Sequence, residues 1–169
     1  AYNPKLQLPR VLGSDAAGEV VAVGEGVTRF RAGDRVANTF MPLWEDGPIT
    51  DAAAKATYGS ERDGVFAELV AVDARALVPL PDHLSYEEGA TLPCAAVTAW
   101  NALSAAGTGP GTTVLLQGTG GVSIFALQLA TALGARCLIT SGDDAKLARA
   151  AELGAAAGTN YRTNPDWDK

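Results

Sequence analysis

Histidine is nearly missing from this sequence, since His83 is the only one in 169 residues. A zinc site built on two or more histidines is therefore excluded within these residues. A Ser-His-Asp triad would have to use His83, and no nucleophile elbow accompanies it. His83 follows Pro81 in a polar loop, and we expect it to be a solvated surface residue.

Cysteine and long apolar runs are equally scarce. Cys94 and Cys137 are the only cysteines, and they form no C-x-x-C pair, so a reducing cytoplasm is the expected compartment. No apolar run approaches the ~20 residues of a membrane span, and no basic segment precedes an apolar stretch as in a secretory signal. With 47% hydrophobic residues, the composition is that of a globular protein.

Positive charge is also limited, and the formal net charge is −6. This acidity argues against a nucleic-acid partner. All of the excess lies in residues 1–90, whereas the charges of residues 91–169 balance. The second part of the chain is therefore the more compatible with a polyanion such as a dinucleotide.

The strongest motif is Gln117-Gly-Thr-Gly-Gly-Val-Ser, which follows the apolar run Val114 to Leu116. The run predicts a buried strand, and the spacing of apolar residues after the glycines predicts a helix, at positions 122, 125, 126, 129, 130 and 133. A strand, a glycine turn and a helix present bare backbone N–H groups to a pyrophosphate. Gly118 permits the tight turn and Gly120 a close approach, although such glycines can also serve packing alone.

The residues that follow continue the same pattern. Gly134 is expected to end the helix, Arg136 to Thr140 to form the next strand, and Asp143 to Gly154 to form a second helix with an acidic start and a glycine stop. This alternation is typical of a right-handed parallel α/β sheet.

The first part of the chain has the pattern of a small barrel or irregular β domain. Short strands are predicted at Gly18 to Gly24, after the turn Arg31 to Asp34, and at Gly64 to Val72. Residues 41–63 predict a long loop with a helical turn near Asp51. Ser85-Tyr-Glu-Glu is a capping box, which predicts a short helix.

Together these motifs resemble the medium-chain dehydrogenase/reductase superfamily, in its zinc-free, quinone-oxidoreductase-like (zinc-type alcohol dehydrogenase-like) branch. The resemblance covers most of residues 6–163. It rests on Gly13-Ser-Asp-Ala-Ala-Gly-Glu-Val-Val-Ala-Val-Gly, Arg31-Ala-Gly-Asp-Arg-Val, Ala90-Thr-Leu-Pro-Cys-Ala-Ala-Val-Thr-Ala-Trp-Asn-Ala-Leu, Gln117-Gly-Thr-Gly-Gly-Val-Ser, Leu153-Gly-Ala and Asn160-Tyr-Arg. It implies an α/β protein with a partial GroES-like β domain in residues 1–90, which binds substrate. The first half of a Rossmann doubly wound parallel sheet, which binds NADP, would follow in residues 91–169. We therefore expect the sequence to be a fragment, poorly stable and scarcely active in isolation.

The resemblance also bears on metal binding. Zinc members of the superfamily carry Gly-His-Glu where this chain has Gly13-Ser14-Asp15, so Ser14 replaces the metal-binding histidine. Cys94 matches a later zinc ligand, but one thiolate cannot hold catalytic zinc, which needs about three protein ligands. We predict no zinc and a semi-buried, apolar role for Cys94. A ligand or reactive-thiol role for Cys94 stays open, as does zinc held by ligands outside this segment.

The cofactor is predicted to be NADP(H) rather than NAD(H). The resemblance places Ser141 where an acidic residue would bind the ribose 2′-OH and repel a 2′-phosphate. Lys146, one helical turn further on, could supply positive charge. The resemblance places Tyr161 and Arg162 after the third strand, where the family often contacts the adenosine side. The charges of Asp143 and Asp144 oppose this interpretation, and both acids could instead cap a helix.

The candidate cofactor-binding residues are Thr98, Gly118, Thr119, Gly120, Gly121, Val122, Ser141, Lys146 and Tyr161. Thr98 matches a position that packs against the nicotinamide in relatives, or else bonds its own helical turn. Trp100 is expected in core or interdomain packing. No catalytic acid–base residue can be identified.

The predicted function is NADPH-dependent hydride transfer to a quinone or α,β-unsaturated carbonyl without zinc. The substrate would be a small molecule, with no nucleic-acid or membrane partner, and full-length relatives are often homodimers. The alternatives are a zinc-dependent alcohol dehydrogenase and a non-catalytic dinucleotide-binding relative.

Overall fold

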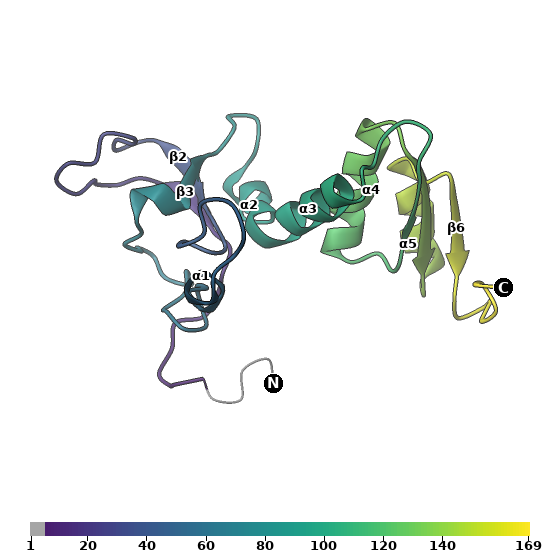
Figure 1. The fold of residues 1–169 in the computed structure, drawn as a ribbon, viewed down its shortest axis with the longest axis horizontal. Coiled ribbons are helices and arrows are strands. Elements are labelled where there is room, and N and C mark those ends of the chain that lie inside the picture. Colours follow the sequence, from purple (N-terminus) through teal and green to yellow (C-terminus); the bar gives the residue numbers. More distant parts are fainter. Residues whose placement is uncertain (1–5) are drawn as a thin grey trace. The chain divides into compact units, whose positions relative to one another are not determined.

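The computed structural model describes residues 6–169 and divides the chain into two compact units, the first ending at Cys94 and the second beginning at Ala95 (Figure 1). An antiparallel three-stranded sheet lies in the first unit, and a parallel three-stranded sheet lies in the second. The α/β class and the order of the two sheets agree with the prediction.

The sheet of the first unit consists of β1 (Ala17–Glu19), β2 (Arg35–Asn38) and β3 (Leu77–Pro79), with β2 in the middle. The end of β2 is tied to the residues before β1. The buried Asn38 accepts the N–H of Ala16 at 2.6 Å and donates its amide to the carbonyl of Ser14 at 2.8 Å. One side chain of the central strand therefore fixes the backbone around Ser14.

Three short helices complete this unit: α1 (Asp51–Lys55), the 3-10 turn η1 (Ala74–Ala76) and α2 (Tyr86–Gly89). The side chain of Thr50 caps α1, and Ser85 and Glu88 form the reciprocal capping box of α2. The sequence predicted α1 and α2, and both predictions are confirmed.

The strand predicted at Gly64 to Val72 is wrong. Its start pairs briefly with the segment before β1, because Val65 and Phe66 donate their N–H groups to the carbonyls of Gly13 and Leu12. The chain then bends, and the Phe66 side chain is exposed. Alternating apolar residues form a strand only where a partner continues the ladder, and the described residues provide one only at the start. For a similar reason β1 occupies only the start of the run predicted at Gly18 to Gly24.

The second unit contains the repeated strand–helix pattern that the sequence predicts. Its elements are β4 (Thr113–Leu116), α4 (Gly121–Ala132), β5 (Arg136–Ser141), α5 (Asp144–Glu152) and β6 (Ala157–Asn160). The strands are parallel in the order β4-β5-β6. Because both crossovers step in the same direction, right-handed connections place α4 and α5 on the same face of the sheet (Figure 1).

The core of this unit lies between that face and the helices. Cys137 and Ile139, two residues apart on β5, are fully buried together with Leu127 of α4. On β4 the alternation leaves Leu115 on the opposite face, where it is 50% exposed.

Helix α3 (Val97–Ala105) packs against α4, and the π-helical turn η2 (Leu92–Ala96), which contains Pro93, precedes it. Ala99 and Leu103 form its buried side. Trp100 is not part of the core, because the helix turns that side chain away from the buried stripe and leaves it half exposed. The other expectation for Trp100, packing between domains, stays a prediction.

The predicted helix ends are confirmed in the second unit. Gly134 adopts a φ of +81° after α4, and the N–H of Ala135 returns to the carbonyl of Ala130, as in a glycine C-cap. The carboxylate of Asp143 caps α5 by accepting the N–H of Lys146 at 3.0 Å. Within residues 6–169, no helix is long and apolar enough to cross a membrane.

Candidate functional site

The glycine turn between β4 and α4 is the centre of the candidate site. Gly118 has a φ of +82°, a conformation that favours glycine, and its N–H donates to the hydroxyl of Thr140 at 3.0 Å. Gly120 has a φ of −79°, and a Cβ added there would meet no atom within 4 Å. The backbone at Gly120 is therefore uncovered and faces open space.

The first turn of α4 carries no side-chain cap. Ser123, which replaces the third glycine of the motif, donates its hydroxyl back to the carbonyl of Gln117 at 3.1 Å. In contrast, Asp143 caps α5 and Ser85 caps α2. Uncapped N–H groups together with the helix dipole favour an anion at this end of α4, beside Gly121 and Val122.

Two predicted site residues meet where β5 ends. The hydroxyls of Thr119 and Ser141 lie 3.0 Å apart, and Ser141 also accepts the N–H of Asp143 at 3.3 Å. Ser141 is 2% exposed. This pair joins the glycine turn to the carboxyl end of β5, the edge at which ligands bind in open α/β sheets.

Tyr161 and Arg162 follow β6 and return to the same edge. Tyr161 donates its N–H to the carbonyl of Ser141 at 3.0 Å. A Cβ added to Gly142 would lie 2.7 Å from the Tyr161 hydroxyl oxygen and 2.9 Å from the Arg162 Nε. Both side chains therefore lie against Gly142, which the sequence interpretation missed; the only signal was a glycine directly after the second strand.

Lys146 is exposed on the first turn of α5. The two acids beside it are already engaged, because Asp143 caps α5 and Asp144 accepts the side-chain amide of Asn160 at 2.7 Å. Thr98 is exposed on α3. Hydrogen bonds thus link Gly118, Thr119, Ser141 and Tyr161 through β5, whereas in the described part of the chain none joins the side chain of Thr98 or Lys146 to the glycine turn.

A groove of about 430 Å³ runs along β4 in this unit, lined by small and apolar side chains of α3 and α4 such as Ala99 and Ala126. Gln117 and Val122 lie in its lining, so the groove adjoins the glycine turn. Within residues 6–169, β4 pairs only with β5.

The first unit contains Ser14, where the family resemblance predicts that a zinc-binding histidine is replaced. The Ser14 hydroxyl donates to the carbonyl of Tyr58 at 3.1 Å. One oxygen of Asp15 is buried without a hydrogen-bond partner in residues 6–169, and burial raises the pKa of this carboxyl. Within residues 6–169, no three His, Cys, Asp or Glu side chains lie close enough together to bind a metal ion. Among these residues, no group of metal ligands surrounds the half-buried Cys94.

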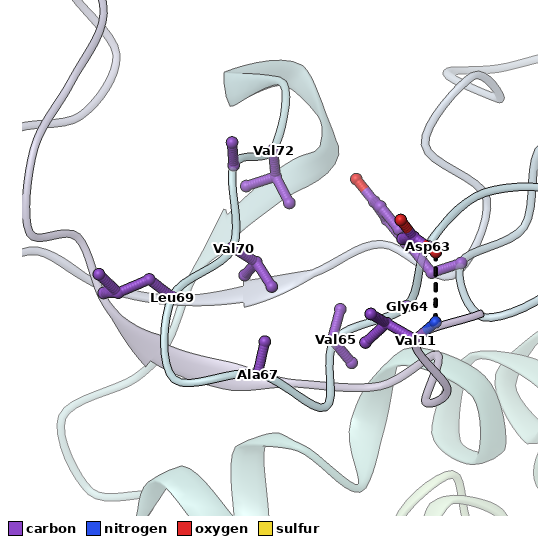
Figure 2. Close-up of a pocket in the computed structure, with 10 residues that line it drawn as sticks. Val11, Asp63, Gly64, Val65, Ala67, Leu69, Val70 and Val72 are labelled. Atoms are coloured by element: carbon purple, nitrogen blue, oxygen red, sulfur yellow. Dashed lines mark hydrogen bonds between the residues drawn. The ribbon is translucent and has the colours of Figure 1, made fainter. Parts of the chain in front are cut away.

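The first unit also has a small apolar pocket of about 230 Å³ (Figure 2). Val11, Val65 and Val70 contribute to its walls. Asp63 is its one acidic wall residue, and its carboxylate accepts the N–H of Val11 at 3.2 Å and pairs with Arg10 at 3.3 Å. Apolar contact is therefore the main chemistry that this pocket offers.

Comparison with known proteins places these features in a family. Residues 1–82 match the alcohol dehydrogenase GroES-like domain. The chain is 49% identical to a zinc-type alcohol dehydrogenase-like protein of Schizosaccharomyces pombe, over 98% of this chain and 49% of that protein.

Two solved structures extend the likeness across both units. An NAD-dependent alcohol dehydrogenase has a TM-score of 0.84 and 40% identity, over 98% of this chain and 50% of its own. The quinone oxidoreductase of Pseudomonas syringae pv. tomato DC3000 has a TM-score of 0.73 and 33% identity, over 95% and 44%. The chain therefore spans about half the length of these relatives. Because the likeness runs through the GroES-like part and on through the glycine turn, the chain belongs to the medium-chain dehydrogenase/reductase superfamily.

Proposed function

We propose that the protein containing this chain is an NADPH-dependent oxidoreductase that transfers hydride to a quinone or an α,β-unsaturated carbonyl without zinc. Residues 1–90 would contribute to substrate binding and residues 91–169 to cofactor binding. The observation that carries the proposal is the uncovered glycine turn at Gly120, followed directly by the uncapped N-terminus of α4. This arrangement suits a pyrophosphate.

Each residue of the site has a definite part in this proposal. The N–H groups of Gly120, Gly121 and Val122 bind the pyrophosphate, while the bond from Gly118 to Thr140 holds the turn in shape before the ligand arrives. Thr119 is held by its hydroxyl contact with Ser141, and Thr98 packs against the nicotinamide. The cofactor, when bound, supplies the hydride, and the protein supplies position and exclusion of water.

The preference for NADP(H) over NAD(H) rests on charge. The end of β5 carries Ser141 rather than an acid, and the neighbouring acids Asp143 and Asp144 already accept hydrogen bonds. The exposed cation Lys146 follows these acids in the sequence, and the exposed Arg162 lies against Gly142 because β6 pairs with β5. NAD(H) is the alternative, since one similar structure is named an NAD-dependent enzyme.

The zinc-free mechanism rests on the donor set around Ser14, whose hydroxyl is directed to a backbone carbonyl. Carbonyl polarisation would then come from hydrogen-bond donors. The alternative is a zinc-dependent alcohol dehydrogenase with ligands outside residues 1–169, in keeping with the name of the Schizosaccharomyces pombe relative. Metal analysis of the complete protein distinguishes the two, since stoichiometric zinc would overturn the zinc-free mechanism.

The direct test is a fluorescence titration with NADPH and NADH, followed by NADPH oxidation with a panel of quinones and enones. We expect tighter binding of NADPH and turnover with at least one electron-poor acceptor. Binding without turnover across the panel would favour a non-catalytic dinucleotide-binding protein. A small-molecule substrate, a cytoplasmic location and homodimer formation also belong to the proposal.

A further inference from the structure

We infer that the peptide Asp46-Gly47 is a site of spontaneous covalent modification, at which Asp46 is converted to isoaspartate through a cyclic succinimide. The chain contains two Asp-Gly pairs, Asp46-Gly47 and Asp63-Gly64. The two pairs have the same local chemistry, but the fold leaves the first open and blocks the second. The contacts of these four residues carry the inference, which does not depend on the proposed function.

The modification requires only water and a proton from solvent. The backbone nitrogen of Gly47 attacks Cγ of Asp46, and the new N–Cγ bond closes a five-membered ring. One carboxyl oxygen leaves as water, with the amide proton and the proton from solvent. Water then adds to the main-chain carbonyl carbon of Asp46 and breaks the bond from that carbon to nitrogen, so the chain continues through Cγ and a proton returns to solvent. Glycine favours the attack because it has no Cβ to crowd the nitrogen.

The reacting groups of Asp46-Gly47 are free in the loop before α1. Both residues are exposed. Within residues 6–169, the Asp46 carboxylate forms no salt bridge or hydrogen bond, and the Gly47 N–H forms no hydrogen bond. The Trp44 indole donates to the Gly47 carbonyl at 3.0 Å, which leaves the Gly47 nitrogen available. A Cβ added at Gly47 would meet no atom within 4 Å, so the nitrogen can be approached without displacing a neighbour.

The reacting groups of Asp63-Gly64 are engaged instead. The Asp63 carboxylate pairs with Arg10 at 3.3 Å and accepts the N–H of Val11 at 3.2 Å (Figure 2). The N–H of Gly64 donates to the carbonyl of Val11 at 2.8 Å. Gly64 is buried, and a Cβ added there would overlap the carbonyl oxygen of Gly13. Ring closure would have to break these contacts, so only molecules that have opened locally can react at this pair.

The modification would lengthen a segment that is anchored at both ends. Glu45, directly before Asp46, pairs with Arg75 at 3.1 Å, and Thr50 caps α1. Isoaspartate inserts the Asp46 Cβ into the main chain between these two anchors. It also moves the negative charge from Cγ to the former main-chain carbonyl carbon.

The test compares both pairs in one sample of the intact, unmodified protein. The protein is kept at neutral pH and physiological temperature for several weeks, either in native buffer or in urea that unfolds it. Peptide mapping measures isoaspartate at each pair, and methyl transfer by an isoaspartyl methyltransferase identifies the product. In native buffer, we expect isoaspartate to form about tenfold or more faster at Asp46 than at Asp63. In urea, the two rates should come within about threefold of each other, because unfolding removes the contacts that block Asp63.

Two variants and a matched control test the chemistry. Asp46→Glu keeps the charge but would need a six-membered ring, which closes far more slowly, so modification at this position should be lost. Asp46→Asn forms the same five-membered ring with ammonia as the leaving group and should react faster than the unmodified protein. The control Asp63→Asn makes the same change at the blocked pair and should stay slow in native buffer, because the Gly64 N–H remains bonded to Val11. Circular dichroism spectra confirm that each variant is folded.

Four results would overturn the inference. Equal rates at the two pairs in native buffer would mean that the contacts of Asp63-Gly64 do not protect it. Isoaspartate that forms at Asp46 only in urea would mean that the loop protects Asp46 as well. The same preference for Asp46 in urea as in native buffer would assign the difference to neighbouring residues in the sequence and not to the fold. Isoaspartate at neither pair in either solution would exclude the reaction itself.

Discussion

Gly118 donates its backbone N–H to the side-chain hydroxyl of Thr140 at 3.0 Å, so the turn after β4 is fastened to the neighbouring strand β5. Thr140 is 3% exposed and lies one residue before Ser141, whose hydroxyl meets Thr119 of the same turn. Two successive residues of β5, Thr140 and Ser141, thus fix the shape of the turn that follows β4. A turn fixed in this way binds its ligand with less ordering cost.

Removing the Thr140 hydroxyl should therefore weaken both the fold and the site. Thr140→Val keeps the shape of the side chain but leaves the Gly118 N–H without its acceptor, which costs about 1–3 kcal/mol. We expect a lower urea midpoint and weaker NADPH binding. Thr113→Val on β4, at an exposed position, is the control and should change neither. Unchanged values for Thr140→Val would show that the hydrogen bond does not support the turn.

Gly120 offers a way to separate binding from folding. Because an added Cβ meets nothing within 4 Å and the φ is −79°, Gly120→Ala should cost less than about 1 kcal/mol of stability. The same methyl group would occupy the space next to a bound pyrophosphate, so NADPH affinity should fall about tenfold or more. Gly109→Ala, which also meets nothing within 4 Å, is the control. Full NADPH affinity in Gly120→Ala would place the pyrophosphate elsewhere.

Asp143 combines a structural and an electrostatic role, and two substitutions can separate them. Asn is as good an N-cap as Asp, so Asp143→Asn should keep α5 stable while removing a negative charge near the proposed NADPH site. We expect a roughly twofold to fivefold gain in NADPH affinity that shrinks as salt is added. Asp143→Ala, which loses the cap at Lys146, should in addition lower stability by about 1 kcal/mol. A gain that does not respond to salt would argue against the electrostatic cause.

Asp15 should make stability depend on pH. Burial raises the pKa of this carboxyl in the folded chain above its ordinary value of 3.8, so the folded state holds the proton more tightly than the unfolded state does. Stability from this group is therefore greatest below pH 3.8 and is lost as pH rises through the folded pKa. Asp15→Asn should lose this dependence and be more stable than the unmodified chain at neutral pH.

Urea denaturation of both proteins across this pH range provides the measurement for Asp15. The difference in midpoint should grow as pH rises and vanish below pH 3.8. The control is Asp82→Asn, at an exposed position. A constant difference at every pH would mean that packing, and not ionisation, distinguishes Asp15→Asn from the unmodified chain.

Sequence reasoning succeeded where the determining contacts are local. The capping box at Ser85, the cap at Asp143 and the glycine stop at Gly134 each involve residues a few positions apart, and all three are present. It failed at Gly64 to Val72, where a strand depends on a distant partner. The core position considered for Trp100 is also not occupied, because the choice of buried face depends on what packs against α3.

The candidate site shows the same division. The glycine turn could be predicted from spacing alone, because the strand, the glycines and the helix are contiguous. The contact between the Thr119 and Ser141 hydroxyls and the approach of Arg162 to Gly142 could not, because they join residues about twenty positions apart through parallel strand pairing.

The two cysteines differ in a way that has a practical use. Cys137 is fully buried on β5, whereas Cys94 is half-buried and lies at the end of the first unit. A maleimide dye added to the native protein should label Cys94 selectively, and Cys137 should react only as the second unit unfolds. Without any substitution, Cys94 can therefore carry a fluorescent reporter at the end of the first unit. Labelling of Cys137 reports when the core of the second unit unfolds.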